Sequence, residues 1–403
     1  MLTLRQIEEA AKTLEDIVVK TPFSYAPILS EMSGCDVYLK KENLQTTGAF
    51  KLRGAFNRIA RLDDDERNGG VVAASAGNHA QGVAFSAAHF GIKAIIFMPE
   101  STPLTKVNGV KRFGAEVILA GGSYDEAYAI AKEFAQKNDM TFIHPFEDDA
   151  VIAGQGTIAL EILESCRELD AVIVPVGGGG LISGIALAIK ELRPEIEVIG
   201  VSASGAPAMK NSYELKKAID TTSVRTIADG IAVRDTSQKT LDLILRYVDR
   251  FISVDDEEIA SAMLFLLERQ KLVVEGAGAV GIAALMHDKL EHLKGKKAAV
   301  VLSGGNVDVT LLSVIIEKGM IKSHRKMKLV VTLVDKPGSL MHLTELLTQL
   351  NANIVHIAYD RTSTDLDYGD ANVTIHLETK GEEHQKQIRE LLSTHGYLSS
   401  EYK

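Results

Sequence analysis

The stretch KKENLQTTGAFKLRGAFN, residues 40–57, gives the first indication of both the fold and the chemistry of this chain. Two threonines and a glycine, residues 46–48, precede the pair Phe50–Lys51, and the residues that follow continue at helical spacing. The pattern predicts a turn that feeds a helix, capped by the small hydroxyl residues, with Lys51 in its first turn. The helix macrodipole is positive there, so it would lower the pKa of the Lys51 amine. That suits a nucleophile that attacks a carbonyl, although most single lysines are surface residues.

Three further motifs follow in order, all rich in glycine and small polar residues: SAGNHAQG at 75–82, GGGGL at 177–181 and SGGN at 303–306. Together with AFKLRGA at 49–55, they resemble the motifs of the fold-type II pyridoxal-phosphate enzymes. The set is most similar to the threonine ammonia-lyase (threonine dehydratase) family. The family's first motif reads SFKxRGA, so Ala49 departs from the more usual serine. The resemblance implies that Lys51 carries pyridoxal 5'-phosphate as an imine.

Composition limits the classes of function. The chain has 403 residues, a formal net charge of −10 and 24% charged residues, as expected of a globular protein of two or three domains. The acidic balance argues against a nucleic-acid partner, which needs a basic face. Only Cys35 and Cys166 are present, without metal or disulfide spacing, which favours a reducing cytoplasm. We expect no signal peptide and no membrane span.

Hydrophobic periodicity predicts an α/β fold. Residues 4–19 read as an amphipathic helix, with a capping box formed by Thr3 and Gln6. Strand and helix patterns then alternate, which predicts parallel strands with helices on both faces. We expect strands at 36–39, 71–74, 93–98, 116–119, 141–143, 171–176, 197–201 and 298–302, and helices at 103–113, 124–136, 150–168, 181–192, 259–268 and 277–287. The resemblance implies two lobes in a catalytic domain of residues 1–321, with the smaller lobe, about 45–143, inserted in the larger.

The composition changes after a basic linker, residues 322–328. Residues 329–403 show a strand–helix–strand–strand–helix order, the split βαβ pattern of ferredoxin-like folds. With the segment DKPGSL at 335–340 they resemble an ACT domain, a module that commonly binds amino acids. The resemblance implies an amino-acid effector near Asp335, Gly338 and Asn353, and modules that pair in a homo-oligomer, either dimer or tetramer. The alternative is a ferredoxin-like addition used only for assembly.

The glycine run directly follows a wholly apolar strand and opens a helix. Free N–H groups and the helix dipole suit such a turn to phosphate, and glycines let the backbone approach closely. A dinucleotide site would need the GxGxxG register, which Ile182 and Ser183 break. In the family that the chain resembles, this run holds the phosphate of the cofactor. The expected cofactor-binding residues of this loop are Gly177, Gly178, Gly179, Gly180 and Leu181.

The other motifs receive their roles from the resemblance. Ser75, Asn78 and His79 match residues that bind the substrate carboxylate, and Asn78 also matches the asparagine that contacts the ring hydroxyl. Phe50 is expected beside the cofactor, and Ser303 matches the residue that hydrogen-bonds the pyridine nitrogen. A neutral hydroxyl there leaves the ring a weaker electron sink than an aspartate would. Each of these residues, taken singly, is more often a turn or structural residue.

Two further positions are interpreted as structural. Glu275 lies in a loop that the resemblance places near the ring, but a carboxylate in the N-cap region is the more common arrangement. Asn306 is left as structural. Relatives with a divalent-cation site place acidic residues after the strand at 197–201, whereas residues 202–207, SASGAP, contain none. We therefore expect no metal site there.

These features predict an enzyme that deaminates L-threonine to 2-oxobutanoate and ammonia by β-elimination of water. Lys51 would remove the α-proton. L-Serine is expected as a second substrate, because one methyl group discriminates weakly. Three alternatives stay open. A serine racemase needs a second acid/base, a serine in the family's racemases, where this chain has Ala76. A β-replacement synthase fits the motif at 75–82 less well, and a non-catalytic amino-acid sensor would not need Lys51.

Overall fold

The computed structural model describes residues 2–364 and 366–401, and the chain divides after Asp308 into two compact units. This boundary differs from the expected one. Helix α14 (Val309–Lys322) belongs to the second unit, and strand β11 (Lys326–Val334) begins inside the expected linker. The linker prediction is wrong because Lys326, Met327 and Lys328 pair with strand β13 and Met327 is buried.

The first unit contains a six-stranded sheet in the order β1-β2-β10-β7-β8-β9. All its neighbouring strands are parallel except the edge strand β1, which is antiparallel to β2. The bounds of its strands are β1 Phe23–Tyr25, β2 Asp36–Lys40, β7 Ala171–Pro175, β8 Glu197–Ala203, β9 Arg250–Val254 and β10 Lys297–Val301. Its helices are α1 Leu4–Leu14, α2 Pro27–Ser33, α8 Asp149–Ser165, α9 Gly180–Leu192, α10 Ala208–Leu215, α11 Gln238–Tyr247, α12 Asp256–Phe265 and α13 Gly276–Met286.

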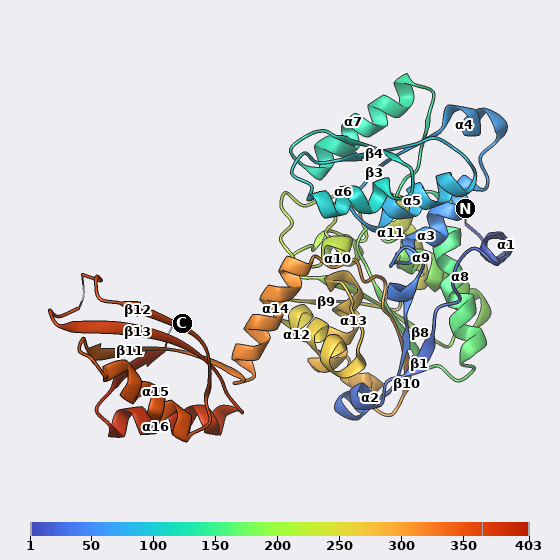
Figure 1. The fold of residues 1–403 in the computed structure, drawn as a ribbon. Helices are drawn as coiled ribbons and strands as arrows, with labels where there is room; N and C mark the ends of the chain where they lie inside the picture. The colour runs from blue at the N-terminus through green and yellow to red at the C-terminus, as the bar shows by residue number, and fades with distance from the viewer. Residues whose placement is uncertain (1, 365, 402–403) are drawn as a thin grey trace. The chain divides into compact units, whose positions relative to one another are not determined.

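Between β2 and β7 the chain builds a second, four-stranded sheet in the order β5-β4-β3-β6, which is parallel throughout. Helix α7 lies on one face, and α5 and α6 lie on the other (Figure 1). The prediction of parallel strands between helices is confirmed for both sheets, and each expected strand ends within two residues of the observed one. The bounds are α3 Lys51–Ile59, α4 Asp64–Gly69, β3 Val71–Ala74, α5 Asn78–His89, β4 Ala94–Met98, α6 Leu104–Lys111, β5 Glu116–Leu119, α7 Tyr124–Lys137 and β6 Thr141–Phe142.

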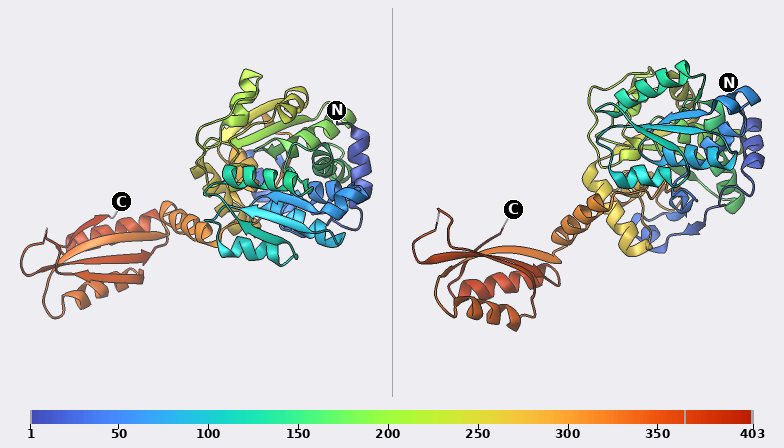
Figure 2. Two further views of the ribbon diagram at one scale, coloured as in Figure 1. Left: turned by 90° about the horizontal axis from the view of Figure 1, so that it is seen from above. Right: turned by 45° about the horizontal axis from the view of Figure 1, so that its top comes forward.

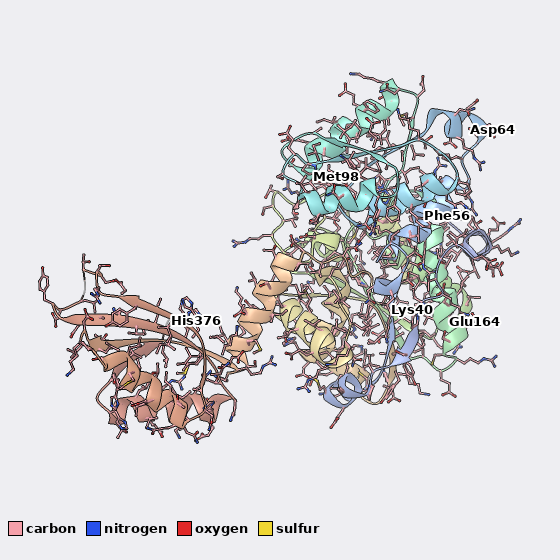
Figure 3. All side chains as sticks on the ribbon, viewed as in Figure 1. Lys40, Phe56, Asp64, Met98, Glu164 and His376 are labelled. Atoms are coloured by element: carbon pink, nitrogen blue, oxygen red, sulfur yellow. The ribbon has the colours of Figure 1, made fainter. Side chains whose placement is uncertain are left out.

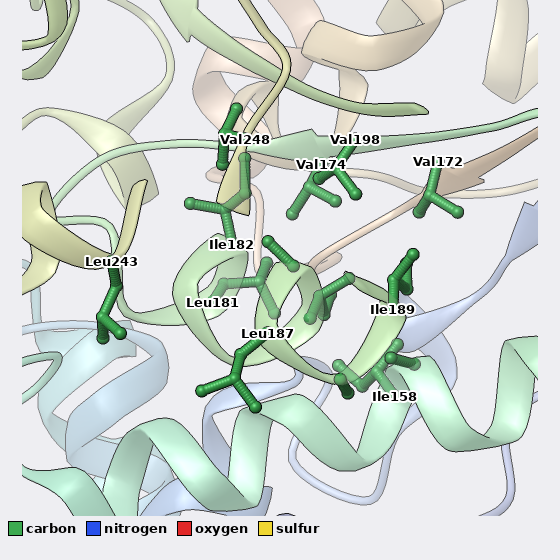
Figure 4. Close-up of a cluster of buried hydrophobic side chains, with 14 of the residues drawn as sticks. Ile158, Val172, Val174, Leu181, Ile182, Leu187, Ile189, Val198, Leu243 and Val248 are labelled. Carbon is green, nitrogen blue, oxygen red and sulfur yellow. The ribbon is translucent and has the colours of Figure 1, made fainter. Parts of the chain in front are cut away.

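The main core of the first unit lies between the large sheet and helices α8 and α9. Apolar side chains of α9 point into the sheet on one side and onto α8 on the other (Figure 4). The five residues of β7 are all fully buried, as expected of a central parallel strand covered on both faces. This packing fixes the start of α9, and with it the glycine run that precedes the helix.

A buried ionic network ties the lysine-bearing helix α3 to α8. The Arg53 guanidinium, which is fully buried, donates to both oxygens of Glu42 at 2.8 Å and to Glu161 Oε1 at 2.6 Å. Lys40, at the end of β2 and labelled in Figure 3, also bonds to Glu161 on α8. Breaking such a pair leaves an uncompensated buried charge, so the network makes the position of α3 costly to change.

The N-terminal helix is shorter than predicted. The capping box of Thr3 and Gln6 is confirmed, but α1 ends at Leu14 instead of residue 19. The backbone leaves the helix at Glu15, and Asp16 adopts a left-handed φ of 63°. The turn redirects Ile17 and Val18, which still pack against the cluster that contains Leu14. Periodic apolar spacing therefore continued past the end of the helix.

The second unit has the strand order β12-β13-β11-β14, antiparallel throughout, and the chain order βαββαβ. This is the predicted split βαβ pattern with one further strand, β14. Helices α15 and α16 cover one face of the sheet (Figures 1 and 2). The bounds are α15 Ser339–Gln349, β12 Asn353–Asp360, β13 Asp370–Glu378, α16 Glu382–Thr394 and β14 Leu398–Glu401.

The three residues expected at an effector site do not lie together in one chain. Asp335 and Gly338 follow the end of β11, whereas Asn353 begins β12 and pairs with Glu378, which pairs with the first residue of β11. The eight residue steps of β11 put about 27 Å between the two ends. The Asp335 carboxylate accepts from Tyr359 at 2.9 Å, and the Asn353 amide donates to Glu378 at 2.7 Å. A site within one copy that uses both residues is therefore ruled out.

Candidate active site

The turn that carries Lys51 is held by backbone contacts rather than by the predicted cap. Helix α3 begins at Lys51, as predicted, but the N-cap position is Phe50, without a side-chain cap bond. The hydroxyl cap is therefore wrong. Instead, the Phe50 N–H donates to the Ser303 carbonyl at 3.0 Å, and the Gly305 N–H donates to the Gly48 carbonyl at 2.8 Å. The lysine motif and the SGGN motif thus form one structural unit.

The Lys51 amine faces a cavity with few polar partners. Its Nζ donates a long hydrogen bond of 3.4 Å to the Pro145 carbonyl and lies 5.6 Å from the centre of the Phe50 ring. Burial lowers the pKa of Lys51 to about 8, and the nearby Glu275 carboxylate partly opposes this shift. The predicted direction is confirmed, but desolvation is the cause, not the helix dipole. A much larger share of this amine is neutral near pH 8 than for an exposed lysine.

All four motifs meet around this cavity, which has a volume of about 660 Å³. The lining includes every candidate residue of the first unit, contributed by the N-terminal ends of α3, α5 and α9 and by the loop after β10. These residues are Phe50, Lys51, Ser75, Asn78, His79, Gly177, Gly178, Gly179, Gly180, Leu181 and Ser303. Segments up to about 250 residues apart in sequence therefore form a single site.

The glycine run is a close-packed cradle. A Cβ at Gly178 would lie 2.4 Å from the Phe146 ring, and one at Gly180 would lie 2.8 Å from Phe146 Cβ. Gly179 has a φ of 88°, in the left-handed region that favours glycine. No side chain fits at these positions, so the backbone itself lines the cavity at the N-terminus of α9. The first N–H groups of a helix lack intrahelical partners and suit an anion such as phosphate.

The SAGNHAQG motif opens α5 at the end of β3, and its histidine is fixed. The His79 Nε2–H donates to the Ile143 carbonyl at 2.8 Å, and the ring is buried. Burial lowers the pKa of His79 to about 3, so the imidazole is neutral. Its Nε2 atom is therefore committed to the backbone, whereas the buried Nδ1 atom has no hydrogen-bond partner among the described residues. The first N–H groups of α5, together with the Ser75 hydroxyl, remain suited to a carboxylate.

Glu275 does not cap a helix, contrary to the interpretation from the sequence. It occupies the N-cap position of α13, but its side chain makes no cap bond. Both carboxylate oxygens instead accept from Asn78 Nδ2, at 2.8 and 3.0 Å. The Asn306 amide donates to Asn78 Oδ1 and to the Thr47 carbonyl, so this residue also belongs to the site.

The segment after β6 supplies wall residues that sequence reasoning missed. His144 Nδ1 accepts from the backbone N–H groups of Phe146 and Glu147, and burial lowers the pKa of His144 to about 4. The Phe146 ring packs against the glycine run, and Pro145 accepts from Lys51. A signal was available, because ligand sites in open α/β sheets gather at the carboxyl ends of strands.

The cavity fits the chemical parts of pyridoxal phosphate. A neutralisable amine suits its aldehyde, the side-chain-free glycine cradle suits its phosphate, and the Ser303 hydroxyl suits a pyridine nitrogen. Across the described residues, no group of three or more histidine, cysteine or acidic side chains is arranged to hold a metal ion. None of the helices in that part of the chain has the length and apolar character needed to span a bilayer.

Comparisons with known proteins agree with this geometry. A family model described as "Pyridoxal-phosphate dependent enzyme" matches residues 14–304. An L-threonine ammonia-lyase of Thermotoga maritima is 48% identical over 397 residues, 98% of each chain. Threonine deaminase isoform 2 of Solanum lycopersicum superposes with a TM-score of 0.76 at 35% identity, covering 79% of this chain and 88% of that one. Maize serine racemase gives 0.75 at 36% identity, with 80% and 99% covered. The chain therefore belongs to the pyridoxal-phosphate-dependent enzymes, in the family that includes the threonine ammonia-lyases.

Proposed function

We propose that this protein is a threonine ammonia-lyase, which converts L-threonine to 2-oxobutanoate and ammonia and also accepts L-serine. The observation that carries the proposal is the partly buried Lys51 amine, which has a lowered pKa and shares one cavity with the glycine cradle and Ser303. The high identity to an L-threonine ammonia-lyase over nearly the whole chain supports the choice of substrate.

Each wall of the cavity has a separate task in this proposal. The glycine run at the start of α9 binds the cofactor phosphate through backbone N–H groups. Ser75 and the first N–H groups of α5 would bind the substrate carboxylate, and Asn78 would hold the ring oxygen. The neutral Ser303 hydroxyl would form a hydrogen bond with the pyridine nitrogen without keeping it protonated. When bound, pyridoxal phosphate supplies the electron sink that makes the substrate's α-proton acidic.

Lys51 Nζ is the group that moves the proton. With a pKa near 8 it is substantially neutral under mildly alkaline conditions, so it can accept the α-proton. The low polarity of its surroundings, with the Phe50 ring and the Pro145 carbonyl as neighbours, keeps competing water away from the amine. The β-hydroxyl takes up a proton and leaves as water, and hydrolysis of the resulting enamine gives 2-oxobutanoate and ammonia.

Racemisation is the main competing activity, because a serine racemase is among the similar structures. A racemase needs a second acid/base on the opposite face of the substrate. At the position where the family's racemases have a serine, this chain has Ala76, which lines the cavity and has no titratable group. Elimination is therefore the favoured outcome.

Product analysis tests the proposal. Purified protein with pyridoxal phosphate is incubated with L-threonine, and 2-oxobutanoate and ammonia are quantified, with Lys51→Ala as the control. We expect equal amounts of the two products from the wild type and neither from the variant. D-Serine formed from L-serine without pyruvate would instead establish a racemase. A requirement for a second nucleophilic substrate would establish a β-replacement synthase.

For the second unit, we propose an ACT-like regulatory role in a homo-oligomer. The βαββαβ order and the DKPGSL turn support this assignment. Because Asp335 and Asn353 lie at opposite ends of the sheet, a site that uses both requires two copies of the unit. We expect isoleucine or valine to change the activity or the melting temperature, and Asp335→Ala or Asn353→Ala to remove that response. Absence of any response to amino acids would leave the unit with an assembly role only.

A further inference from the structure

Asn78, Glu275 and Asn306 form a chain of hydrogen bonds along one wall of the cavity. The Asn78 amide nitrogen donates to both oxygens of Glu275, and the Asn78 amide oxygen accepts from Asn306. Asn306 is itself held by the Thr47 carbonyl, 3.1 Å from its amide nitrogen. Both ends of the Asn78 amide are therefore fixed by side chains from distant parts of the chain.

The Glu275 partner decides which way the Asn78 amide points. An asparagine amide is nearly symmetrical in shape, and its nitrogen and oxygen can exchange places by a simple flip. An ionised carboxylate only accepts, so it must face the nitrogen. A flip would bring the amide oxygen against two carboxylate oxygens and the amide nitrogen against the amide nitrogen of Asn306. The amide nitrogen has two N–H groups, so one can bond to the carboxylate while the other serves the cavity.

The surrounding backbone makes room for this carboxyl group. A Cβ at Gly304 would lie 2.5 Å from Glu275 Oε1, and a Cβ at Gly230 would lie 3.0 Å from the same atom. The Glu275 N–H also donates to the Gly304 carbonyl at 3.0 Å. Two glycines from different loops therefore border the carboxylate. The loop that carries Glu275 is also tied to the SGGN motif.

Stability alone does not account for a carboxylate at this position. Burial raises the pKa of Glu275, and the charged groups that face it are Lys51, Asp229 and Lys106. No ion pair joins Glu275 to a cation among residues 2–364 and 366–401, so its ionised form depends on the Asn78 amide. An isolated buried carboxylate is costly, which favours a role in the site over a role in folding.

We propose that Glu275 is a positioning residue that holds the Asn78 amide as a hydrogen-bond donor toward the ring oxygen of bound pyridoxal phosphate. The inference rests on the proposed function, in which Asn78 contacts that oxygen. A donor at this point stabilises the ring oxygen as an anion. Because the charge on this oxygen changes the electronic state of the ring, the absorption spectrum of the bound cofactor reports on the Asn78–Glu275 pair without any substrate.

A double-mutant cycle tests the proposal in the full-length holoenzyme. The variants are Glu275→Gln, Asn78→Ala and the double variant, with Asp229→Asn as a matched control. Asp229 lines the same cavity and lies 3.4 Å from Lys106, so its replacement removes an equal charge without touching Asn78. The readouts are the ratio of the cofactor's absorption bands, the dissociation constant for pyridoxal phosphate, and kcat/KM.

We expect Glu275→Gln and Asn78→Ala to change the band ratio in the same direction and to lower kcat/KM about 10- to 100-fold each, the range expected for a hydrogen bond to a charged group. The double variant should fall no more than about threefold below Asn78→Ala, because Glu275 acts through Asn78. Asp229→Asn should show no coupling to Asn78. Glu275→Asp, which keeps the charge, should recover part of the wild-type spectrum.

Two results would overturn the inference. One is a Glu275→Gln protein with a lower melting temperature but a wild-type spectrum and cofactor affinity, which indicates a structural role. The other is a double variant whose loss equals the product of the two single losses. If Glu275→Gln does not fold, the cycle is run with Glu275→Ala, which also removes the carboxylate. If the absorption spectra show that Glu275 and Asn78 are coupled but no 2-oxobutanoate forms, the proposed lyase activity is wrong while the positioning role of Glu275 holds. A failure of the proposed function can therefore be told apart from a failure of this inference.

Discussion

The lowered pKa of Lys51 makes a quantitative prediction about how the apoprotein takes up its cofactor. Only the neutral amine attacks an aldehyde, so the attachment rate follows the neutral fraction. With a pKa of about 8, that fraction is roughly 9% at pH 7 and roughly 90% at pH 9. Attachment should therefore accelerate about tenfold over this range and then level off. An ordinary lysine, with a pKa near 10.4, would accelerate about a hundredfold and keep rising.

The assay is stopped-flow absorption after apoprotein is mixed with pyridoxal phosphate at a series of pH values. The same titration with a free lysine derivative corrects for the ionisation of the cofactor itself. The variant Glu275→Gln tests the direction of the Lys51 pKa shift. Because the Glu275 carboxylate raises the pKa of Lys51, its loss should move the midpoint to lower pH.

A corrected rate that rises tenfold per pH unit through pH 9.5 would refute the reasoning, since it would show that Lys51 keeps an ordinary pKa. A midpoint that moves to higher pH in Glu275→Gln would show that the electrostatic account of the cavity has the wrong sign.

Three further predictions follow from packing and charge. Gly178→Ala should weaken cofactor binding at least tenfold in an equilibrium titration, because its Cβ would meet the Phe146 ring at 2.4 Å. Adding Phe146→Ala should restore part of the affinity. As a control, Gly109→Ala should leave the affinity unchanged, because this helical glycine has nothing closer than 3.7 Å to an added Cβ. Arg53→Met should lower the free energy of unfolding by about 3–5 kcal/mol in denaturant titrations, because Glu42 becomes an unpaired buried charge. Adding Glu42→Met should recover part of the lost stability. Equal stability of the wild type and Arg53→Met would contradict the prediction. His79→Gln should keep the wild-type pH dependence of kcat between pH 5 and 8, because the neutral imidazole does not titrate there. If an ionisation in this range disappears from the kcat profile of the variant, His79 transfers a proton in catalysis.

Most of the fold was predictable from local sequence patterns. The alternation of apolar strands and amphipathic helices is a property of neighbouring residues, so β2, β7, β8, β10 and the four-stranded sheet were predictable, whereas the edge strands β1 and β9 were not among the expected strands. Boundaries that depend on tertiary contacts were not. Residues 15–19 keep helical spacing, yet α1 ends at Leu14, and the left-handed Asp16 turns Ile17 and Val18 back onto the cluster that contains Leu14. Residues 326–328 look like a polar linker, but they pair with β13.

The candidate site shows the same division. Lys51, the glycine run, Asn78 and Ser303 were predictable because each belongs to a compact motif. Glu275 was not, because its N-cap position suggests a helix cap and only the folded chain brings Asn78 to its carboxylate. The regulatory residues stay a prediction, because the strand register separates Asp335 from Asn353 within one copy and only an assembly of two copies could bring them together.

The most direct test of the central claim is to locate the lysine that holds the cofactor. Borohydride reduction of the holoenzyme fixes pyridoxal phosphate to its lysine, and peptide mass spectrometry then identifies the site. We expect a single modified peptide that contains Lys51. Modification of Lys106, the other lysine that lines the cavity, with Lys51 unmodified, would contradict it.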